Sequence, residues 1–204
     1  QNFKLVNSLF GRSKGDEVLI EIARILRVTC GEENVYARTG GDTFALCIPK
    51  KQYLERALEK GVERIRALID SPSYRLNIHI GIYEVDNRNL PISIMYDRAY
   101  MALQSIRNNR EKIIAWFDES MLESALHEQK VISDFENNLR SGQFVIYVQP
   151  QVNHEGKIEG GECLVRWILP NGTMVPPFEF IGILEQSDLI ASLDRYVWEV
   201  DAIQ

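Results

Sequence analysis

The sequence of 204 residues has few of the features that mark several common classes of protein. Its three cysteines, Cys30, Cys47 and Cys163, are widely spaced and form no C-x-x-C motif. This pattern argues against a disulfide framework and against a zinc site. It favours a reducing compartment, so we expect a cytoplasmic location.

The sequence also lacks a surplus of basic residues and a long apolar run. It has 23 Lys and Arg against 29 Asp and Glu, a net charge of −6, which argues against binding to nucleic acid or to an anionic membrane. No run approaches the roughly 18–20 apolar residues of a membrane span. The first residues are no signal peptide. We expect both ends to be cuts from a longer protein, which could be membrane-attached through other regions.

What is present is the composition of a folded protein, with 45% hydrophobic and 25% charged residues. Hydrophobic periodicity predicts an alternation of helices and strands, which is typical of an α/β protein. We expect helices over 15–30, 51–70, 92–107 and 118–140 and from about 190 to the end, and strands over 35–38, 44–48, 74–85, 112–117, 144–152 and 157–167.

The first segment with chemical content is the predicted hairpin turn at Gly40-Gly41-Asp42. Two glycines at a turn let the backbone approach a ligand and offer N–H groups to phosphate. A carboxylate directly after them can hold Mg²⁺ beside that phosphate. Taken alone, the same pattern also fits a hairpin without a function.

The neighbouring motifs favour a functional turn. In order they are Phe3-Lys4-x-x-Asn7, Phe10-Gly11, Gly15-Asp16-x-x-Leu19 and Arg38-x-Gly40-Gly41-Asp42-x-Phe44. This ordered set resembles the GGDEF domain of bacterial diguanylate cyclases, which make cyclic di-GMP from two GTP molecules. The resemblance implies a nucleotidyl cyclase-like central sheet with flanking helices over residues 1–117, with its first strand missing.

The resemblance also implies roles for individual residues. Asn7 and Asp16 fall on the positions that read guanine, and Gly40 and Gly41 on the turn that cradles phosphate. Asp42 falls on a carboxylate that binds Mg²⁺ or Mn²⁺. GTP is therefore a candidate ligand of this half.

Two departures from the family pattern oppose cyclase activity. Thr43 stands where the family has a glutamate essential for cyclisation, and a neutral hydroxyl cannot replace a carboxylate. Gln104 stands where the family has a basic residue that contacts phosphate. We expect no catalytic residue in this half. Whether GTP still binds is open, because the fold could also serve only as a dimerising or spacing module.

A second family resemblance begins near residue 142. Gln149-Pro150-Gln151, then Glu162-Cys163-Leu164-Val165-Arg166-Trp167, then Pro177-x-x-Phe180-Ile181, resemble the opening of an EAL domain, a cyclic di-GMP phosphodiesterase. The resemblance implies that Glu162 binds a catalytic metal and that Gln149, Leu164 and Arg166 contact the dinucleotide. It also implies a TIM-like barrel, of which 142–204 would be an incomplete N-terminal fragment.

Residues 118–141 connect the two halves as a charged helix. Its narrow apolar stripe leaves two alternatives open, packing on a domain or pairing with a second copy of the chain. Asp118 is its expected N-cap.

Together these features predict a cyclic di-GMP signalling protein. The GGDEF half is expected to be inactive and regulatory, and the longer parent to be a phosphodiesterase through its EAL domain. This fragment alone is expected to be inactive, because the family's remaining metal ligands come later in the sequence. The alternative is a nucleotide receptor or interaction module without catalysis, with GTP and cyclic di-GMP as ligands.

Overall fold

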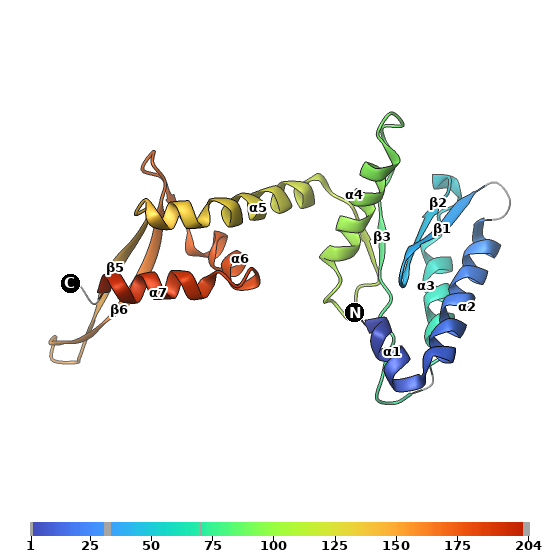
Figure 1. Cartoon of the computed structure of the whole chain (residues 1–204), viewed down its shortest axis with the longest axis horizontal. Helices are drawn as coiled ribbons and strands as arrows, with labels where there is room; N and C mark the ends of the chain where they lie inside the picture. Colours follow the sequence, from blue (N-terminus) through green and yellow to red (C-terminus); the bar gives the residue numbers. More distant parts are fainter. Residues whose placement is uncertain (1, 31–33, 70, 202–204) are drawn as a thin grey trace. The chain divides into compact units, whose positions relative to one another are not determined.

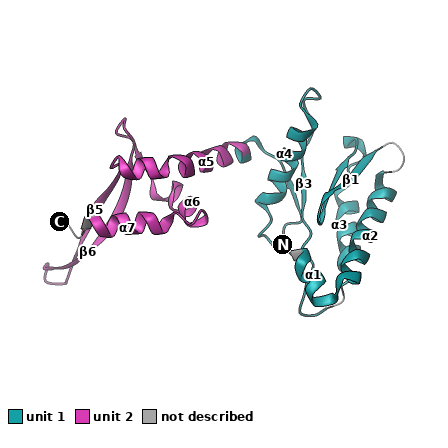
Figure 2. Ribbon diagram, viewed as in Figure 1, with its two compact units in different colours: residues 1–121 teal, residues 122–204 magenta. Residues whose placement is uncertain are grey.

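Residues 2–30, 34–69 and 71–201 are described by the structure, a computed structural model. They form two compact units, one on each side of the boundary between Met121 and Leu122 (Figure 2). That boundary lies within one helix, α5 (Glu119–Arg140). Each unit is described by itself.

Unit 1 begins with two helices, and a β-hairpin and a third helix follow them (Figure 1). Its elements are α1 (Asn2–Phe10), α2 (Arg12–Cys30), β1 (Val35–Gly40), β2 (Thr43–Cys47), a 3-10 turn η1 (Lys50–Gln52) and α3 (Glu55–Arg66). Val6, Val18, Ile65, Ile69 and Leu76 form the buried core beneath them. The helical period of α2 and α3 places Val18 and Ile65 on the faces that meet in this core.

The second part of unit 1 is a β–α–β segment. It consists of β3 (Ile80–Ile82), α4 (Ile92–Ser105) and β4 (Ile114–Trp116), with β3 and β4 parallel. The strand β3 carries Gly81, where a Cβ atom would lie 2.0 Å from the carbonyl oxygen of Ala99 on α4. Because a glycine stands there, the helix can lie directly on the strand.

Unit 2 is a three-stranded antiparallel sheet with helices packed on one face. Its strands are β5 (Phe144–Val152), β6 (Ile158–Ile168) and β7 (Met174–Val175), in the order β5-β6-β7. The 3-10 turn η2 (Pro177–Glu179) and the helices α6 (Ile181–Gln186) and α7 (Ile190–Asp201) follow. The strands described here do not close into a barrel, as expected of an incomplete EAL domain.

An aromatic cluster forms the core of unit 2. Phe135 of α5 packs against Phe144 of β5, and Trp167 of β6 and Phe180 contact the same ring, with centroid distances of 5.5–5.7 Å. Tyr196 of α7 donates a hydrogen bond to the Phe144 carbonyl oxygen at 2.9 Å. The aromatic burial fixes the helices on the sheet.

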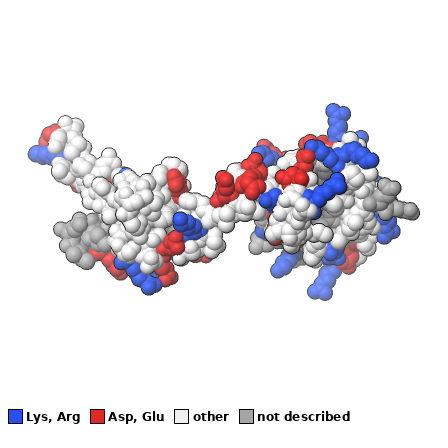
Figure 3. All heavy atoms as spheres, turned by 90° about the horizontal axis from the view of Figure 1, so that it is seen from above, with Lys and Arg blue, Asp and Glu red and all other residues white. Residues whose placement is uncertain are grey.

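Over the second half of the connecting helix α5, the apolar stripe packs on a domain, which is one of the two alternatives left open by the sequence. Val131 and Phe135 are buried in the core of unit 2, and Leu139 packs against it. Asp118 caps the helix as predicted, because its Oδ1 accepts a hydrogen bond from the Ser120 N–H at 2.9 Å. Figure 3 shows acidic side chains gathered along the first half of this helix, which carries Glu119, Glu123 and Glu128.

The α/β class is confirmed, but several predicted elements are wrong in extent. The helix α1 was not predicted from the sequence, and the helix expected from residue 15 begins at Arg12. The helix over 51–70 is divided into η1 and α3, because Pro49 opens a separate 3-10 turn. Residue 70 and the end of the last predicted helix, 202–204, lie outside the described residues.

The largest error concerns the strand predicted over 74–85, of which only Ile80–Ile82 is a strand. The alternating Leu76 and Ile78 do pack inward as the pattern indicates. However, the Leu76 carbonyl oxygen accepts a hydrogen bond from Arg66 Nε at 3.1 Å instead of one from a neighbouring strand. The expected central sheet is correspondingly present as two separate strand pairs, β1-β2 and β3-β4.

Among the described residues, no helix combines the length and the hydropathy that crossing a bilayer requires.

Candidate functional site

The Gly40-Gly41-Asp42 segment forms the exposed tip of the β1–β2 hairpin. Gly40 pairs with Thr43, and Gly41 has a φ of +51°, a conformation that glycine adopts without strain. Arg38 Nε donates a hydrogen bond to the Gly41 carbonyl oxygen at 2.8 Å, which holds the turn from one side. The tip can therefore present backbone N–H groups and the exposed Asp42 carboxylate to a ligand.

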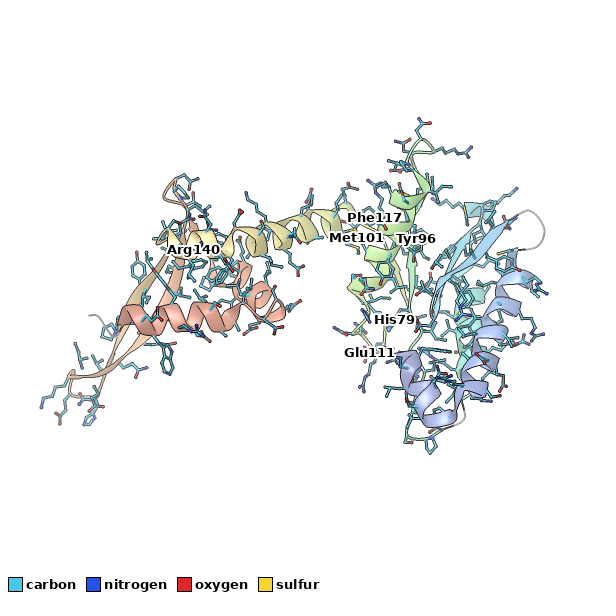
Figure 4. The ribbon with its side chains drawn as sticks, in the orientation of Figure 1. His79, Tyr96, Met101, Glu111, Phe117 and Arg140 are labelled. Atoms are coloured by element: carbon cyan, nitrogen blue, oxygen red, sulfur yellow. The ribbon has the colours of Figure 1, made fainter. Side chains whose placement is uncertain are left out.

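The same turn is tied to α4. The Thr39 hydroxyl lies 3.2 Å from the Tyr96 hydroxyl, and the Tyr96 ring stacks on Tyr100 with centroids 6.1 Å apart (Figure 4). The role of Tyr96 was not predicted, because a tyrosine at helical spacing in the sequence does not indicate a partner in a distant hairpin.

The two departures from the family pattern, Thr43 and Gln104, have uncharged side chains. Thr43 opens β2, is half-buried, and its carbonyl oxygen accepts a hydrogen bond from the Thr39 hydroxyl at 3.5 Å. Gln104 lies near the end of α4, where its Oε1 accepts a hydrogen bond from Arg107 Nη1 at 3.3 Å. Neither side chain can act as a base or as an anionic metal ligand.

Asn7 and Asp16 lie where α1 meets α2. Both side chains are exposed, and Gly11, with a φ of +83°, turns the chain between the two helices. Gly15 is buried beside Asp16, and a Cβ atom on it would lie 2.0 Å from Asn7 Oδ1. The fold thus brings these two polar side chains to one helix crossing, while Gly40–Asp42 lie on the separate β1–β2 hairpin.

The candidate residues of unit 2 share one face of its sheet. Gln149 of β5 stands opposite Glu162 of β6, and Leu164 stands opposite Tyr147. Side chains alternate between the faces of a strand, so Gln149, Glu162, Leu164 and Arg166 all project away from the aromatic core. Gln149 and Glu162 are exposed, and the Arg166 guanidinium donates a hydrogen bond to the Val165 carbonyl oxygen at 2.9 Å.

Neither of the two candidate metal ligands, Asp42 and Glu162, belongs to a complete metal centre among the described residues. Asp42 belongs to unit 1 and Glu162 to unit 2. Across 2–30, 34–69 and 71–201, no three His, Cys, Asp or Glu side chains are grouped so as to hold a metal ion. Mg²⁺ demands near-octahedral oxygen coordination, so one carboxylate does not fit it as a complete site, and we derive no catalytic step through a metal.

A cluster around Arg98 was not predicted from the sequence. The Arg98 guanidinium lies 5.2 Å from the ring centroids of both Tyr83 and Phe117, donates to Tyr83 Oη at 3.0 Å, and lies 3.5 Å from Glu119 (Figure 4). Tyr83 in turn donates to Asp86 at 2.7 Å, which lowers the pKa of that carboxyl. Through Phe117 and Glu119, the cluster holds the start of α5 against α4.

His79 precedes β3 directly and makes a contact that joins two loops. His79 Nε2 lies 2.9 Å from the Asn109 carbonyl oxygen, and this contact joins the segment before β3 to the loop after α4 (Figure 4).

Cys30 is buried, and burial raises the pKa of its thiol, which is opposite to the shift that activates a nucleophile.

Comparison with known families gives a matching family model for each of the two parts of the chain. Residues 1–112 match the family model described as "Diguanylate cyclase, GGDEF domain". The chain belongs to the GGDEF family. Residues 132–200 match the EAL domain model, so the GGDEF domain is followed by part of an EAL domain.

Two relatives match nearly the whole chain. A bifunctional diguanylate cyclase/cyclic di-GMP phosphodiesterase, MucR of Pseudomonas aeruginosa, is 31% identical over 96% of this chain and 29% of its own length. The cyclic di-GMP phosphodiesterase PdeR of Escherichia coli is 26% identical over 96% of this chain and 30% of its own length. This GGDEF–EAL chain therefore spans about 30% of the length of these relatives.

Among solved structures, the S helix-GGDEF-EAL part of Vibrio cholerae LapD, bound to c-di-GMP, matches 97% of this chain and 47% of its own. The sequence identity is 18% and the TM-score is 0.46.

Proposed function

We propose that this chain is the GGDEF–EAL region of a cyclic di-GMP signalling protein whose GGDEF domain binds GTP without converting it. One observation carries the proposal. The signature turn is present as Gly40-Gly41-Asp42, with the glycine conformation that it requires, but Thr43 follows it instead of a carboxylate.

In this proposal each candidate residue has a role that its position permits. The exposed Asn7 amide and Asp16 carboxylate pair with the polar edge of guanine. The backbone N–H groups at Gly40 and Gly41 receive phosphate oxygens, and Asp42 contributes one carboxylate toward a Mg²⁺ or Mn²⁺ ion carried by the nucleotide.

The absence of cyclisation follows from the chemistry of the step. The 3′-hydroxyl of one GTP must lose its proton as its oxygen attacks the α-phosphorus of the other, and pyrophosphate leaves. A threonine hydroxyl is neutral at pH 7 and neither accepts that proton nor binds the ion as an anion would. We therefore assign the GGDEF domain a regulatory role.

The EAL half supports a phosphodiesterase role for the longer parent. We propose that Gln149, Leu164 and Arg166 contact the dinucleotide and that Glu162 supplies one ligand of a divalent metal. Phosphodiester hydrolysis at a two-metal site needs several carboxylates. Since Glu162 has no companion acidic cluster in the described part of unit 2, we expect no hydrolysis by this chain alone.

The proposal places the domain limits at 1–117 and 142–204, with 118–141 as the connecting helix. It places these domains in the cytoplasm, which suits the three unbridged thiols of Cys30, Cys47 and Cys163.

Calorimetry of the full chain with GTP and Mg²⁺ tests the GTP site. We expect Asp16→Asn to weaken GTP binding by roughly tenfold or more, because the charged acceptor of a hydrogen-bonded pair is lost. Glu59→Gln, an exposed carboxylate on α3, is the matched control and should leave the affinity unchanged. Equal affinity in the Asp16→Asn variant and the wild type would refute the assignment.

A further inference from the structure

Gly15 occupies the point at which α1 lies on α2. The residue is buried, and an ideal Cβ atom built on it would lie 2.0 Å from Asn7 Oδ1, 3.2 Å from Asn7 Cγ and 3.4 Å from Phe3 Cε1. The first two separations are shorter than ordinary contacts, so the Asn7 amide occupies the space that any other side chain at position 15 would take.

The helices themselves cannot easily separate to make room. Val6 of α1 and Val18 of α2 are both fully buried in the core of unit 1, and Phe3 and Phe10 pack against the same core. Close-packed interiors resist such displacement. A methyl group at position 15 would therefore move the Asn7 amide, which is the end of a rotatable side chain, and not the backbone of α1.

We propose that Gly15 is a positioning residue for Asn7, and that it sets the selectivity of the site for guanine. Gly15 acts by lacking a side chain, which leaves the Asn7 amide at the helix crossing beside Asp16. The proposal rests on the proposed function, in which Asn7 and Asp16 read guanine.

A purely structural role for Gly15 predicts a different outcome. Gly15 is the fourth residue of α2, and alanine favours a helix more than glycine does. If only helix geometry mattered, Gly15→Ala would leave GTP binding intact. If Gly15 positions Asn7, the same substitution weakens binding of GTP while the chain stays folded.

The experiment measures GTP and ATP binding to the full chain by calorimetry with Mg²⁺. We expect Gly15→Ala to weaken GTP binding about tenfold and to leave ATP binding unchanged, because a well-placed amide contributes to discrimination between bases. Asn7→Ala should have the same effect, and the double variant should be no worse than either single one. Gly61→Ala on α3 is the matched control, since its Cβ would lie 3.5 Å from Ile25 Cγ2, an ordinary contact.

A second measurement does not depend on binding. The NMR signals of the Asn7 side-chain amide should shift in the Gly15→Ala variant and stay in place in the Gly61→Ala variant. Unshifted signals, or additive losses of affinity in the double variant, would overturn the proposal. If the wild type binds no GTP, the proposed function fails, and the Asn7 signals still decide whether Gly15 positions that side chain. If Gly15→Ala fails to fold, the double variant, which lacks the Asn7 amide, should recover the fold.

Discussion

At the scale of single residues, two glycines of unit 1 have different neighbours, so we expect their substitution by alanine to have different effects. Gly15 faces the end of the Asn7 side chain, whereas Gly81 faces the backbone of α4 at Ala99 and Leu103. A side-chain amide can rotate away from a new methyl group, but a helix backbone cannot.

We therefore expect Gly81→Ala to destabilise unit 1 by about 1–3 kcal/mol, the range of overpacked cores. Its Cβ would lie 2.0 Å from the Ala99 carbonyl oxygen and 2.5 Å from the Leu103 nitrogen. Urea unfolding of the full chain, with Gly61→Ala as the control, measures the loss. A Gly81→Ala variant as stable as the wild type would show that α4 can shift without cost.

Single residues also show how far the sequence could predict the site. The Gly-Gly turn and the Asp118 cap follow from local chemistry, so the sequence indicated both. The role of Gly15 and the contact between Thr39 and Tyr96 depend on segments brought together by packing, which no local pattern encodes. A glycine within an otherwise helical pattern was the one available signal for Gly15.

At the scale of elements, the helix α5 has its start fixed by two independent sets of contacts. Asp118 caps the first turn of α5. Hydrogen bonds from the Ser120 side chain and backbone hold the pKa of Asp118 below its ordinary value of 3.8. A carboxyl whose pKa is lowered by folding stabilises the folded state above the ordinary value, and the contribution is lost as the pH falls through the lowered pKa.

Accordingly, Asp118→Ala should weaken the start of α5 at pH 7, because the cap is removed. The difference between the wild type and Asp118→Ala should shrink as the pH falls from 3.8 through the lowered pKa, because the wild-type carboxyl becomes protonated over that range. Amide hydrogen exchange at Ser120 and Met121, corrected for the intrinsic rate at each pH, follows this change. A difference that does not vary with pH would contradict a charge-dependent cap.

The second set of contacts is the Arg98 cluster. We expect Arg98→Ala to speed amide exchange across Glu119–Met121, because Phe117 and Glu119 lose the guanidinium between them. Arg98→Lys retains the charge but not the planar group, so it should restore little of the protection. Exchange unchanged in both variants would mean that the Asp118 cap alone fixes the start of α5.

Elements also show where periodicity misled the prediction. Leu76 and Ile78 alternate as in a strand and do pack inward, but alternation reports which side chains are buried and not whether a partner strand exists. For β5 and β6, whose residues are paired along their length, the pattern and the ladder agree.

At the scale of the whole chain, the proposed nucleotide-binding residues are present, but the described residues include no grouped set of metal ligands. The GGDEF domain retains its turn and its polar helix crossing but has Thr43 and Gln104 in place of charged groups. The EAL part presents Gln149, Glu162 and Arg166 on one sheet face without an acidic cluster. The motif order indicated both halves in advance, whereas the shared sheet face of Gln149, Glu162 and Arg166 follows from the strand register that the structure shows.

In the proposed function, the GGDEF domain binds GTP without converting it. The most direct test is to incubate the full chain with GTP and Mg²⁺, and to measure bound nucleotide and cyclic di-GMP in the same sample. We predict that GTP is bound and recovered unchanged, with no cyclic di-GMP above the background of a sample without protein. Cyclic di-GMP that accumulates with time, and is lost in an Asp42→Asn variant, would contradict the account.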